Sequence, residues 1–335
     1  MNTKDPSRHA PRIVAIGGGT GLSTMLRGLK KETARLTAIV TVADNGGGSG
    51  VLRQELGMLP PGDVRSCLQA LANTEPTMEA LLAYRFTEGN LKGQSFGNLF
   101  LAALNGMCGS FDKAVAKMSE VLAITGRVLP VTNENVQILA DFDDGVTVTG
   151  ECEIADYKKT SDSRIRRVYM LPENPPALSD CLDAIREADM ILLGPGSLYT
   201  SVIPNLLVDG IADAIHASDA VKVYVMNLMT QDGETEGYSA EDHIRALFDH
   251  GGTGLFDYCL VNDLPLPKEL LNEYRREGAA PIEANARALL RLGVRAEYAP
   301  VALWNHGLIR HDPDALAHAL MELYRSASPT RIYKK

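Results

Sequence analysis

Apolar residues along this 335-residue chain follow two patterns that alternate from the N-terminus onward. Short runs rich in β-branched residues lie at 12–16 and 36–44, and each leads into a glycine-rich stretch. Between them, residues 22–31 carry apolar side chains at helical spacing. A strand, a glycine turn, a helix and a second strand form a βαβ unit. The pattern therefore predicts that the chain opens with two parallel strands of one sheet.

The same alternation returns in the second half of the chain. The predicted elements are a strand beginning at 190 that breaks at Gly194-Pro195-Gly196, a helix at 202–217, a strand at 221–229, a helix at 239–250, a strand at 256–263 and a helix at 267–277. Ser239, followed three residues later by Asp242, is typical of a capping box at a helix start. Strands that alternate with helices predict an α/β fold with a Rossmann-like, doubly wound and mainly parallel sheet.

Three stretches depart from this alternation. Residues 64–124 contain successive helical patterns, which predict a helical insertion packed near the first βαβ unit. Residues 136–154 alternate apolar and polar side chains around Asp143-Asp144-Gly145, which predicts a small antiparallel hairpin. Residues 1–11 are polar and charged and predict a disordered arm. Because no linker sequence divides the remainder, we expect a single domain over 12–335.

Charge and cysteine content exclude several classes of protein. The formal net charge of −9 argues against a nucleic-acid-binding surface and against an anionic-membrane surface, although a local basic pocket remains compatible with it. The five cysteines show no C-x-x-C and no zinc spacing with histidine, which suits a reducing compartment. We find no secretory signal and no apolar stretch of bilayer-spanning length, so we expect a cytoplasmic protein.

The first predicted strand ends in a glycine-rich loop at 17–22. Glycines in such a loop let backbone N–H groups approach a phosphate at a helix N-terminus. The spacing is imperfect for the nicotinamide fingerprint, which has glycine where this chain has leucine, and a tight turn without ligand is the alternative. We favour nucleotide contact, and the candidate ligand-binding residues of this first loop are Gly18, Gly19, Thr20, Gly21 and Leu22.

A second glycine-rich loop follows the strand that ends at Asp44. Asp44, Asn45 and Gly47 are its candidate ligand-binding residues, and we expect a mobile loop here rather than an immediate helix. An acid beside flexible amides can bond ribose or sugar hydroxyls, hold Mg²⁺, or cap its own backbone in an Asx turn. The sequence leaves these three alternatives open.

A third loop, at 194–201, combines glycines with hydroxyl side chains at the start of a helix. This combination is typical of an anion or sugar site. Its candidate residues are Gly194, Gly196, Ser197, Tyr199 and Thr200. Three such loops at the carboxyl edge of one parallel sheet predict a shared binding cleft.

Other polar residues have simpler interpretations. Asp63 lies just before a predicted helix, and we favour a helix N-cap over a catalytic role for it. His243 and His250 are spaced two helical turns apart, and so are His311 and His318. Since no third metal ligand is in view, we interpret these histidines as surface or structural residues.

Read together, six motifs resemble the gluconeogenesis factor family, which is related to 2-phospho-L-lactate transferase (CofD). The motifs are GGGTGLS, TVADNGGGSGVLR, PPGDVRSCL, GQSFGNL, GPGSLYTSVIPNL and NLMTQDGETEGY. The likeness continues through NEYRREGAAPI and NHGLIRHDPDAL, so it covers essentially the whole chain. The resemblance implies a CofD-like Rossmann fold and a cytoplasmic factor for growth and cell shape on gluconeogenic carbon sources.

The resemblance also implies a ligand, UDP-N-acetylglucosamine, and residues that bind it. Tyr274 would stack on the uracil or sugar, and the Arg310 guanidinium would grip the diphosphate through paired N–H bonds. Asn98 and Asn227 lie in matching motifs and complete the candidate ligand-binding set. A regulatory protein partner in amino-sugar or cell-wall precursor synthesis is implied as well, and we expect a homo-oligomer.

Three positions depart from the family pattern. Asn45 stands where a second acid is common, Gly48 where serine is common, and Gln94 where histidine is common. Fewer acids leave less negative charge for Mg²⁺, which is the metal of the transferase relatives. For this reason we prefer a ligand-binding regulator to an enzyme.

The alternative function is a Mg²⁺-dependent phosphoryl or nucleotidyl transferase of the CofD type. In that case Asp44 and Asp63 would be the metal ligands and catalytic acids, and Arg53 or Arg65 would stabilise developing phosphate charge. A nicotinamide-dependent oxidoreductase ranks last, because no His, Lys or Tyr arrangement for proton transfer to a carbonyl is evident.

Overall fold

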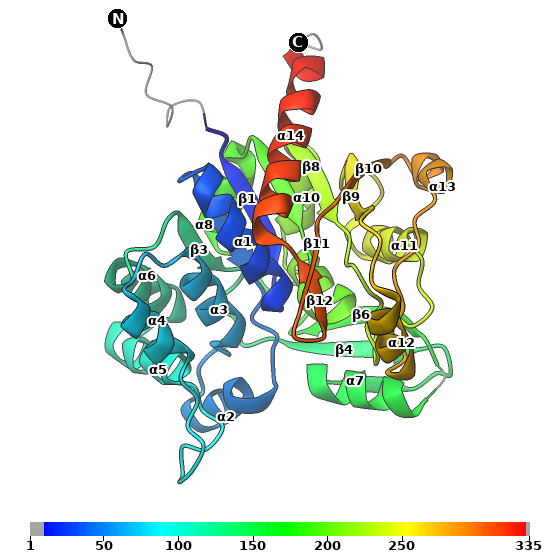
Figure 1. The fold of residues 1–335 in the computed structure, drawn as a ribbon. Coiled ribbons are helices and arrows are strands. Elements are labelled where there is room, and N and C mark those ends of the chain that lie inside the picture. The colour runs from blue at the N-terminus through cyan, green and yellow to red at the C-terminus, as the bar shows by residue number, and fades with distance from the viewer. Residues whose placement is uncertain (1–9, 162, 333–335) are drawn as a thin grey trace, which may run out of the picture.

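The computed structural model describes residues 10–161 and 163–332, so the predicted arm at 1–11 lies almost entirely outside the described residues. Its centre is a seven-stranded parallel sheet in the order β10-β9-β8-β7-β1-β2-β3. The strands are β1 (Ile13–Gly17), β2 (Leu36–Val40), β3 (Arg127–Pro130), β7 (Met190–Leu193), β8 (Val221–Val225), β9 (Tyr258–Asn262) and β10 (Arg295–Ala299). The predicted Rossmann-like α/β fold is confirmed (Figure 1).

The strand order places a topological switch point between β1 and β7. From β1 the chain first adds β2 and β3 on one side, and it later adds β7, β8, β9 and β10 on the other. Open α/β sheets bind ligands in the crevice at such a point, outside the carboxyl ends of the strands. The first and third glycine-rich loops follow β1 and β7, so they are neighbours at this crevice, whereas the second loop follows β2.

The helices flank the sheet, and α1 (Gly19–Glu32) packs against α3 (Gly62–Leu71) and α14 (Pro313–Ile332) (Figure 1). The helical insertion is confirmed as α3 together with α4 (Pro76–Ala83), α5 (Phe96–Cys108) and α6 (Phe111–Val121). The remaining helices are α2 (Gly47–Leu56), α7 (Glu151–Thr160), α8 (Ser179–Glu187), η2 (Leu198–Val202), α9 (Ile203–Leu206), α10 (Ile211–Ala217), α11 (Ala240–Gly251), α12 (Lys268–Arg276) and α13 (Ala286–Arg291).

Two small antiparallel sheets accompany the main one. The predicted hairpin is confirmed as β4 (Gln137–Phe142) and β5 (Thr147–Thr149), but α7 begins at Glu151, inside the range expected for the hairpin. A third strand, β6 (Ile165–Leu171), pairs with β4 on its other side and was not predicted. The second sheet is a hairpin of β11 (Ala302–Asn305) and β12 (Leu308–His311).

Some local expectations were wrong. The segment after Asp44 is not simply a mobile loop, because α2 begins at Gly47. The helix expected at 202–217 is divided into a π-helical turn and two short helices, with Gly210 at φ +82° before the last one.

The capping box of α11 is confirmed, since Ser239 and Asp242 bond each other's backbone N–H groups. Among the described residues, no helix combines the length and apolar character that a bilayer crossing needs.

Close packing of α1 on α14 depends on a glycine. A Cβ atom added to Gly28 would lie 1.8 Å from the carbonyl oxygen of Pro313, the first residue of α14. Glycine in a helix interior normally costs stability relative to alanine. Here the extra atom would push the two helices apart, so the usual preference reverses.

We expect Gly28→Ala to lower the free energy of unfolding by about 1–3 kcal/mol, the range for overpacked cores. Gly106→Ala is the matched control, because Gly106 also lies inside a helix and a Cβ there meets nothing within 4 Å. That control should gain stability by up to about 1 kcal/mol. Urea denaturation of both variants is the measurement, and equal effects of the two changes would contradict the packing argument.

Candidate functional site

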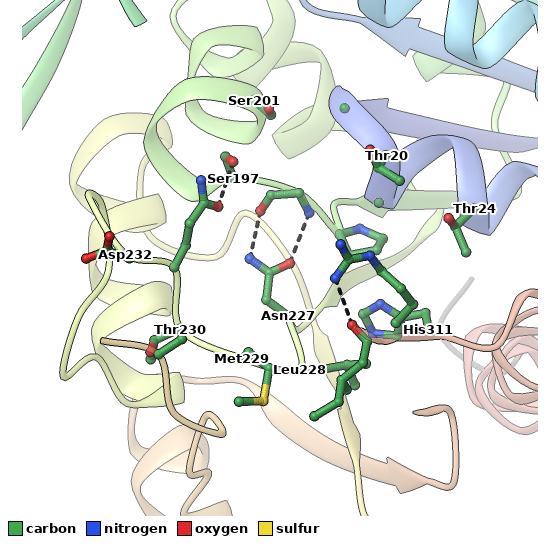
Figure 2. Close-up of a pocket in the computed structure, with 18 of the residues that line it drawn as sticks. Thr20, Thr24, Ser197, Ser201, Asn227, Leu228, Met229, Thr230, Asp232 and His311 are labelled. Carbon is green, nitrogen blue, oxygen red and sulfur yellow. Dashed lines mark hydrogen bonds between the residues drawn. The ribbon is translucent and has the colours of Figure 1, made fainter. Parts of the chain in front are cut away.

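A cavity of about 700 Å³ opens at the switch point between β1 and β7. Its wall is formed by the first and third glycine-rich loops, the segment after β8, and side chains from α12 and β12 (Figure 2). Eight of the candidate ligand-binding residues line it: Gly19, Thr20, Gly21, Gly196, Ser197, Asn227, Tyr274 and Arg310. The volume lies within the usual range for small-molecule sites.

The first and third loops touch through backbone atoms. A Cβ on Gly21 would lie 2.5 Å from the carbonyl oxygen of Pro195, so glycine is required for this contact. Glycines that the sequence suggested for ligand contact therefore also serve to bring the two loops together.

The N-terminus of α1 faces the cavity without a side-chain cap. Its N-cap residue is Gly18, and no acidic residue occupies the first turn. The Gly19 N–H is bonded by the Asp63 carboxyl, while the first turn of a helix leaves further N–H groups without intrahelical partners. Thr20 and Gly21 therefore offer backbone donors at the positive end of the helix dipole, where an anion binds favourably.

The anion site expected at the start of the third loop's helix is already filled by the protein. Glu234 is 3% exposed, and its carboxylate accepts hydrogen bonds from the N–H groups of Leu198, Tyr199 and Thr200 at 3.0, 3.2 and 3.0 Å. Burial raises the pKa of Glu234 to about 7, against the opposing effect of these hydrogen bonds. The expectation of a free anion site at Tyr199 and Thr200 was therefore wrong.

Asn227 holds the third loop in place. Its Oδ1 accepts from the Gly196 N–H at 3.0 Å, and its Nδ2 donates to the Gly196 carbonyl at 2.7 Å (Figure 2). Ser197 on the same loop donates to Gln231 at 2.7 Å. Both polar atoms of the Asn227 side chain thus bond the backbone of one residue, Gly196, so Asn227 positions the loop.

Tyr274 and Arg310 come from different elements and meet at one side of the cavity. The hydroxyl oxygen of Tyr274, on α12, accepts from the Ile309 N–H at 2.9 Å. Arg310 is exposed, and its Nη1 donates to the Ile309 carbonyl at 2.9 Å. Among the described residues that line the cavity, Arg310 is the sole Lys or Arg. Tyr274 therefore anchors the strand that carries this cation.

Several candidate residues lie outside the cavity wall: Gly18, Leu22, Asp44, Asn45, Gly47, Asn98, Gly194, Tyr199 and Thr200. The Leu22 side chain is fully buried in the core. The Tyr199 hydroxyl is buried and lies 2.9 Å from that of Tyr238. Asn98 is 3% exposed, and its Oδ1 accepts from Arg65 at 3.0 Å. These side chains support the fold around the site.

The second glycine-rich loop does not join the other two at the cavity. Asp44 accepts from the Gly46 N–H at 2.7 Å, so the Asx turn is the alternative that the structure shows. Asn45 donates to Glu153 at 2.7 Å and accepts from the Cys152 N–H at 3.0 Å. The prediction of one cleft shared by three loops was wrong for this loop, because β2 lies beyond β1 on the side away from β7.

Carboxyl groups gather between the first and second loops. Asp63 is not the N-cap of α3, whose N-cap position is Pro61, because its carboxyl turns to the Gly19 N–H. Burial and then the charge of Asp44 raise the pKa of Asp63 to about 6. Burial, the charge of Asp44 and a hydrogen bond to Asp44 raise the pKa of Glu151 well above its usual range. Burial and the neighbouring Asp44 thus favour the protonated form of Glu151.

These acids do not fit a metal site made by the protein alone. Carboxylate oxygens are the ligands that Mg²⁺ prefers. Within the described part of the chain, however, no three side chains of His, Cys, Asp or Glu are spaced to hold one ion. Arg53 and Arg65, the arginines of the transferase alternative, are bonded to the Val136 carbonyl and to Asn98.

Two of the three departures from the family pattern lie against each other. A Cβ on Gly48 would sit 2.8 Å from Oε1 of Gln94, a residue that is 6% exposed. A larger residue at position 48 would require Gln94 to move. The two changes are therefore coupled by packing in this chain.

Sequence reasoning missed Glu234 and assumed a helical spacing between His311 and His318 that the structure does not have. Nothing in the motif containing Glu234 marks it as the partner of a loop some 35 residues earlier. His311 lies in β12 and His318 in α14, so they do not share a helix. Asp312-Pro313, with the Asp312 side chain capping the helix start, was the available signal that α14 begins after His311.

Comparison with known proteins gives consistent results. The family described as 2-phospho-L-lactate transferase CofD matches residues 13–302. A protein of Thermoanaerobacterium thermosulfurigenes, provisionally named a gluconeogenesis factor, is 53% identical over 94% of this chain and 97% of its own length. The gluconeogenesis factor of Bacillus subtilis is 46% identical over 94% of this chain and 98% of its own. A crystal structure of a Bacillus halodurans protein superposes with a TM-score of 0.90 at 45% identity, covering 93% of this chain and 99% of that one.

Proposed function

The chain belongs to the gluconeogenesis factors of the CofD family, and from this premise we propose that it is a regulatory protein that binds UDP-N-acetylglucosamine. The binding site in this proposal is the cavity between the first and third glycine-rich loops. One observation supports it above the others: the N-terminus of α1, whose N-cap residue Gly18 has no side chain, and the exposed guanidinium of Arg310 line the same cavity.

Two sources of positive potential suit a diphosphate. The N–H groups at the start of α1 donate without bringing a counter-charge, and the helix dipole favours an anion there. Arg310 offers several N–H donors in a planar fork that matches phosphate oxygens. Asp232 and Glu277 also line the cavity, so the charge of Arg310 is more than offset among the side chains of the wall, and the attraction for an anion is confined to the surroundings of Arg310 and the start of α1. A local basic site in an acidic protein agrees with the net charge of −9.

The rest of the wall suits the nucleoside and the sugar. Hydroxyl groups of Thr20, Thr24 and Ser201 line the cavity and can exchange hydrogen bonds with sugar hydroxyls. The ring of Tyr274 provides a flat face for uracil or for N-acetylglucosamine. In this proposal the bound protein acts on a partner in amino-sugar or cell-wall precursor synthesis in the cytoplasm, during growth on gluconeogenic carbon sources.

Calorimetry tests the proposal directly. UDP-N-acetylglucosamine should bind the purified full chain, and addition of a chelator should leave its affinity unchanged, because backbone amides and Arg310 supply the anion contacts. Mass spectrometry of the recovered ligand should find it intact. Absence of binding would refute the proposal, and Mg²⁺-dependent turnover that Asp63→Asn abolishes would establish the transferase alternative instead.

Tyr274→Phe separates the ring of this residue from its hydroxyl. We expect UDP-N-acetylglucosamine affinity to fall about three- to tenfold, because the Ile309 N–H loses its partner and the strand carrying Arg310 is held less firmly. Tyr274→Ala should weaken binding further, since it removes the ring as well. Calorimetry on both variants is the measurement, and Tyr298→Phe, outside the cavity, is the matched control. Wild-type affinity in Tyr274→Phe would show that the hydroxyl is dispensable for binding.

A further inference from the structure

His311 is the last residue of β12 and forms part of the cavity wall (Figure 2). The residue is 8% exposed. One side of its ring hydrogen-bonds the backbone of Met226, and Nε2 on the other side has no partner. Several buried side-chain atoms of the described residues lack a partner, but His311 Nε2 is the one that belongs to a residue of the cavity wall.

The hydrogen bond to Met226 determines the tautomer of this ring. A backbone carbonyl only accepts hydrogen bonds, so the ring nitrogen that meets it, Nδ1, carries the hydrogen. Burial lowers the pKa of His311 to about 4, so the ring is neutral at neutral pH. Nε2 of a neutral ring with hydrogen on Nδ1 is an acceptor with a free lone pair.

An acceptor without a donor is unfavourable inside a protein. Leaving such a group unsatisfied costs about 1–3 kcal/mol, and unpaired buried groups are rare in native proteins. A phosphate oxygen cannot satisfy Nε2, because both atoms would be acceptors. A hydroxyl group or a ring N–H group can satisfy it.

Arg310 and His311 are adjacent but differ in depth. Arg310 is exposed and offers donors, whereas His311 is buried and offers an acceptor. A ligand that satisfies both must carry an anionic group near the mouth of the cavity and a hydrogen-bond donor deeper in the wall. A nucleotide sugar has this arrangement, since its diphosphate is flanked by hydroxyl-bearing rings and a base with an N–H group.

We propose that Nε2 of His311 accepts a hydrogen bond from a hydroxyl or ring N–H of the nucleotide sugar and thereby selects ligands that carry a donor beside the diphosphate. This inference rests on the proposed function and adds a specificity-determining residue to the same site. It also gives Met226 a role, because its carbonyl fixes the tautomer in which Nε2 is the acceptor.

The experiment compares three variants of the full chain by calorimetry with UDP-N-acetylglucosamine. His311→Phe keeps a planar ring without an acceptor and should bind about tenfold more weakly. His311→Gln keeps an acceptor oxygen and should recover part of that loss. His318→Phe is the matched control, an exposed histidine on α14 outside the cavity, and should bind like the wild type.

A spectroscopic measurement distinguishes a direct contact from a structural role. In protein labelled with ¹⁵N-histidine, the Nε2 resonance of His311 should move upfield when UDP-N-acetylglucosamine is added, as expected when a bare nitrogen accepts a hydrogen bond. An unmoved resonance would overturn the inference, even if His311→Phe binds weakly.

The outcomes also separate this inference from the proposed function. If the wild type binds UDP-N-acetylglucosamine and His311→Phe binds it equally well, the role of His311 is refuted and the proposed function stands. If the wild type does not bind the nucleotide sugar, both are refuted.

Discussion

Arg310→Ala should weaken the binding of UDP-N-acetylglucosamine by about ten- to a hundredfold. Charge-assisted hydrogen bonds contribute about 1.5–3 kcal/mol, and every 1.4 kcal/mol corresponds to a factor of ten in affinity. No second Lys or Arg among the described residues that line the cavity can replace the lost charge, while Asp232 and Glu277 remain. Calorimetry at fixed ionic strength is the measurement.

Two further variants define what Arg310 contributes. Arg310→Lys keeps the charge but loses the planar fork, so its affinity should lie between those of the wild type and Arg310→Ala. Arg291→Ala removes an exposed arginine from α13, outside the cavity, and should leave affinity unchanged. Wild-type affinity in Arg310→Ala would remove this residue from the site.

Glu234→Ala should cause the largest loss of stability, about 3 kcal/mol or more. The change leaves the N–H groups of Leu198, Tyr199 and Thr200 without their acceptor, and all three residues are buried. Each unsatisfied buried donor costs about 1–3 kcal/mol. Because these N–H groups hold the loop that lines the cavity, nucleotide-sugar binding should also weaken. Urea denaturation and calorimetry measure the two effects.

Glu234→Gln tests the charge of the same residue through pH. The folded-state pKa of about 7 lies above the ordinary value of 4.5, so the folded protein binds this proton more tightly than the unfolded chain does. Glu234 therefore makes the free energy of unfolding fall as pH rises from about 4.5 to about 7. The stability advantage of the wild type over Glu234→Gln should shrink across that window.

A control isolates this residue from the other acids. Asp63 and Glu151 also have raised pKa values, and they contribute the same sign of pH dependence in both proteins. Comparing wild type with Glu234→Gln cancels their contributions, and Glu283→Gln, at an exposed position, should follow the wild-type curve. A difference that stays constant from pH 5 to pH 8 would show that Glu234 does not titrate in this range.

Local sequence patterns predicted the elements but not their order in the sheet. The runs at 12–16 and 190–193 lead into glycines, and each forms a parallel strand, as does the run expected at 221–229, which ends early at Val225. Whether two strands become neighbours depends on how the whole chain winds, which no local pattern records. This is why the second loop resembled the other two in sequence and yet lies away from them.

The site was predictable only in part for a similar reason. Tyr274 and Arg310 came from resemblance to a family, and the structure brings them to the cavity that the first and third loops line. The role of Glu234 could not be predicted from the sequence, because this side chain acts by accepting three hydrogen bonds from the backbone of a loop that is distant in the sequence. A buried carboxylate that replaces an external anion has the same sequence signature as an ordinary surface acid.

The hairpin of β11 and β12 has a consequence for how binding preferences diverge among related proteins. The segment that matches the CofD family ends at residue 302, where this hairpin begins. Arg310 and His311 therefore lie beyond the matched segment, on β12, whose one partner strand in the described part of the chain is β11. Residues of this short hairpin can therefore be replaced, by evolution or by protein engineering, to change which ligand is bound. The hydrogen bonds between the strands of the seven-stranded sheet are not affected by such a replacement.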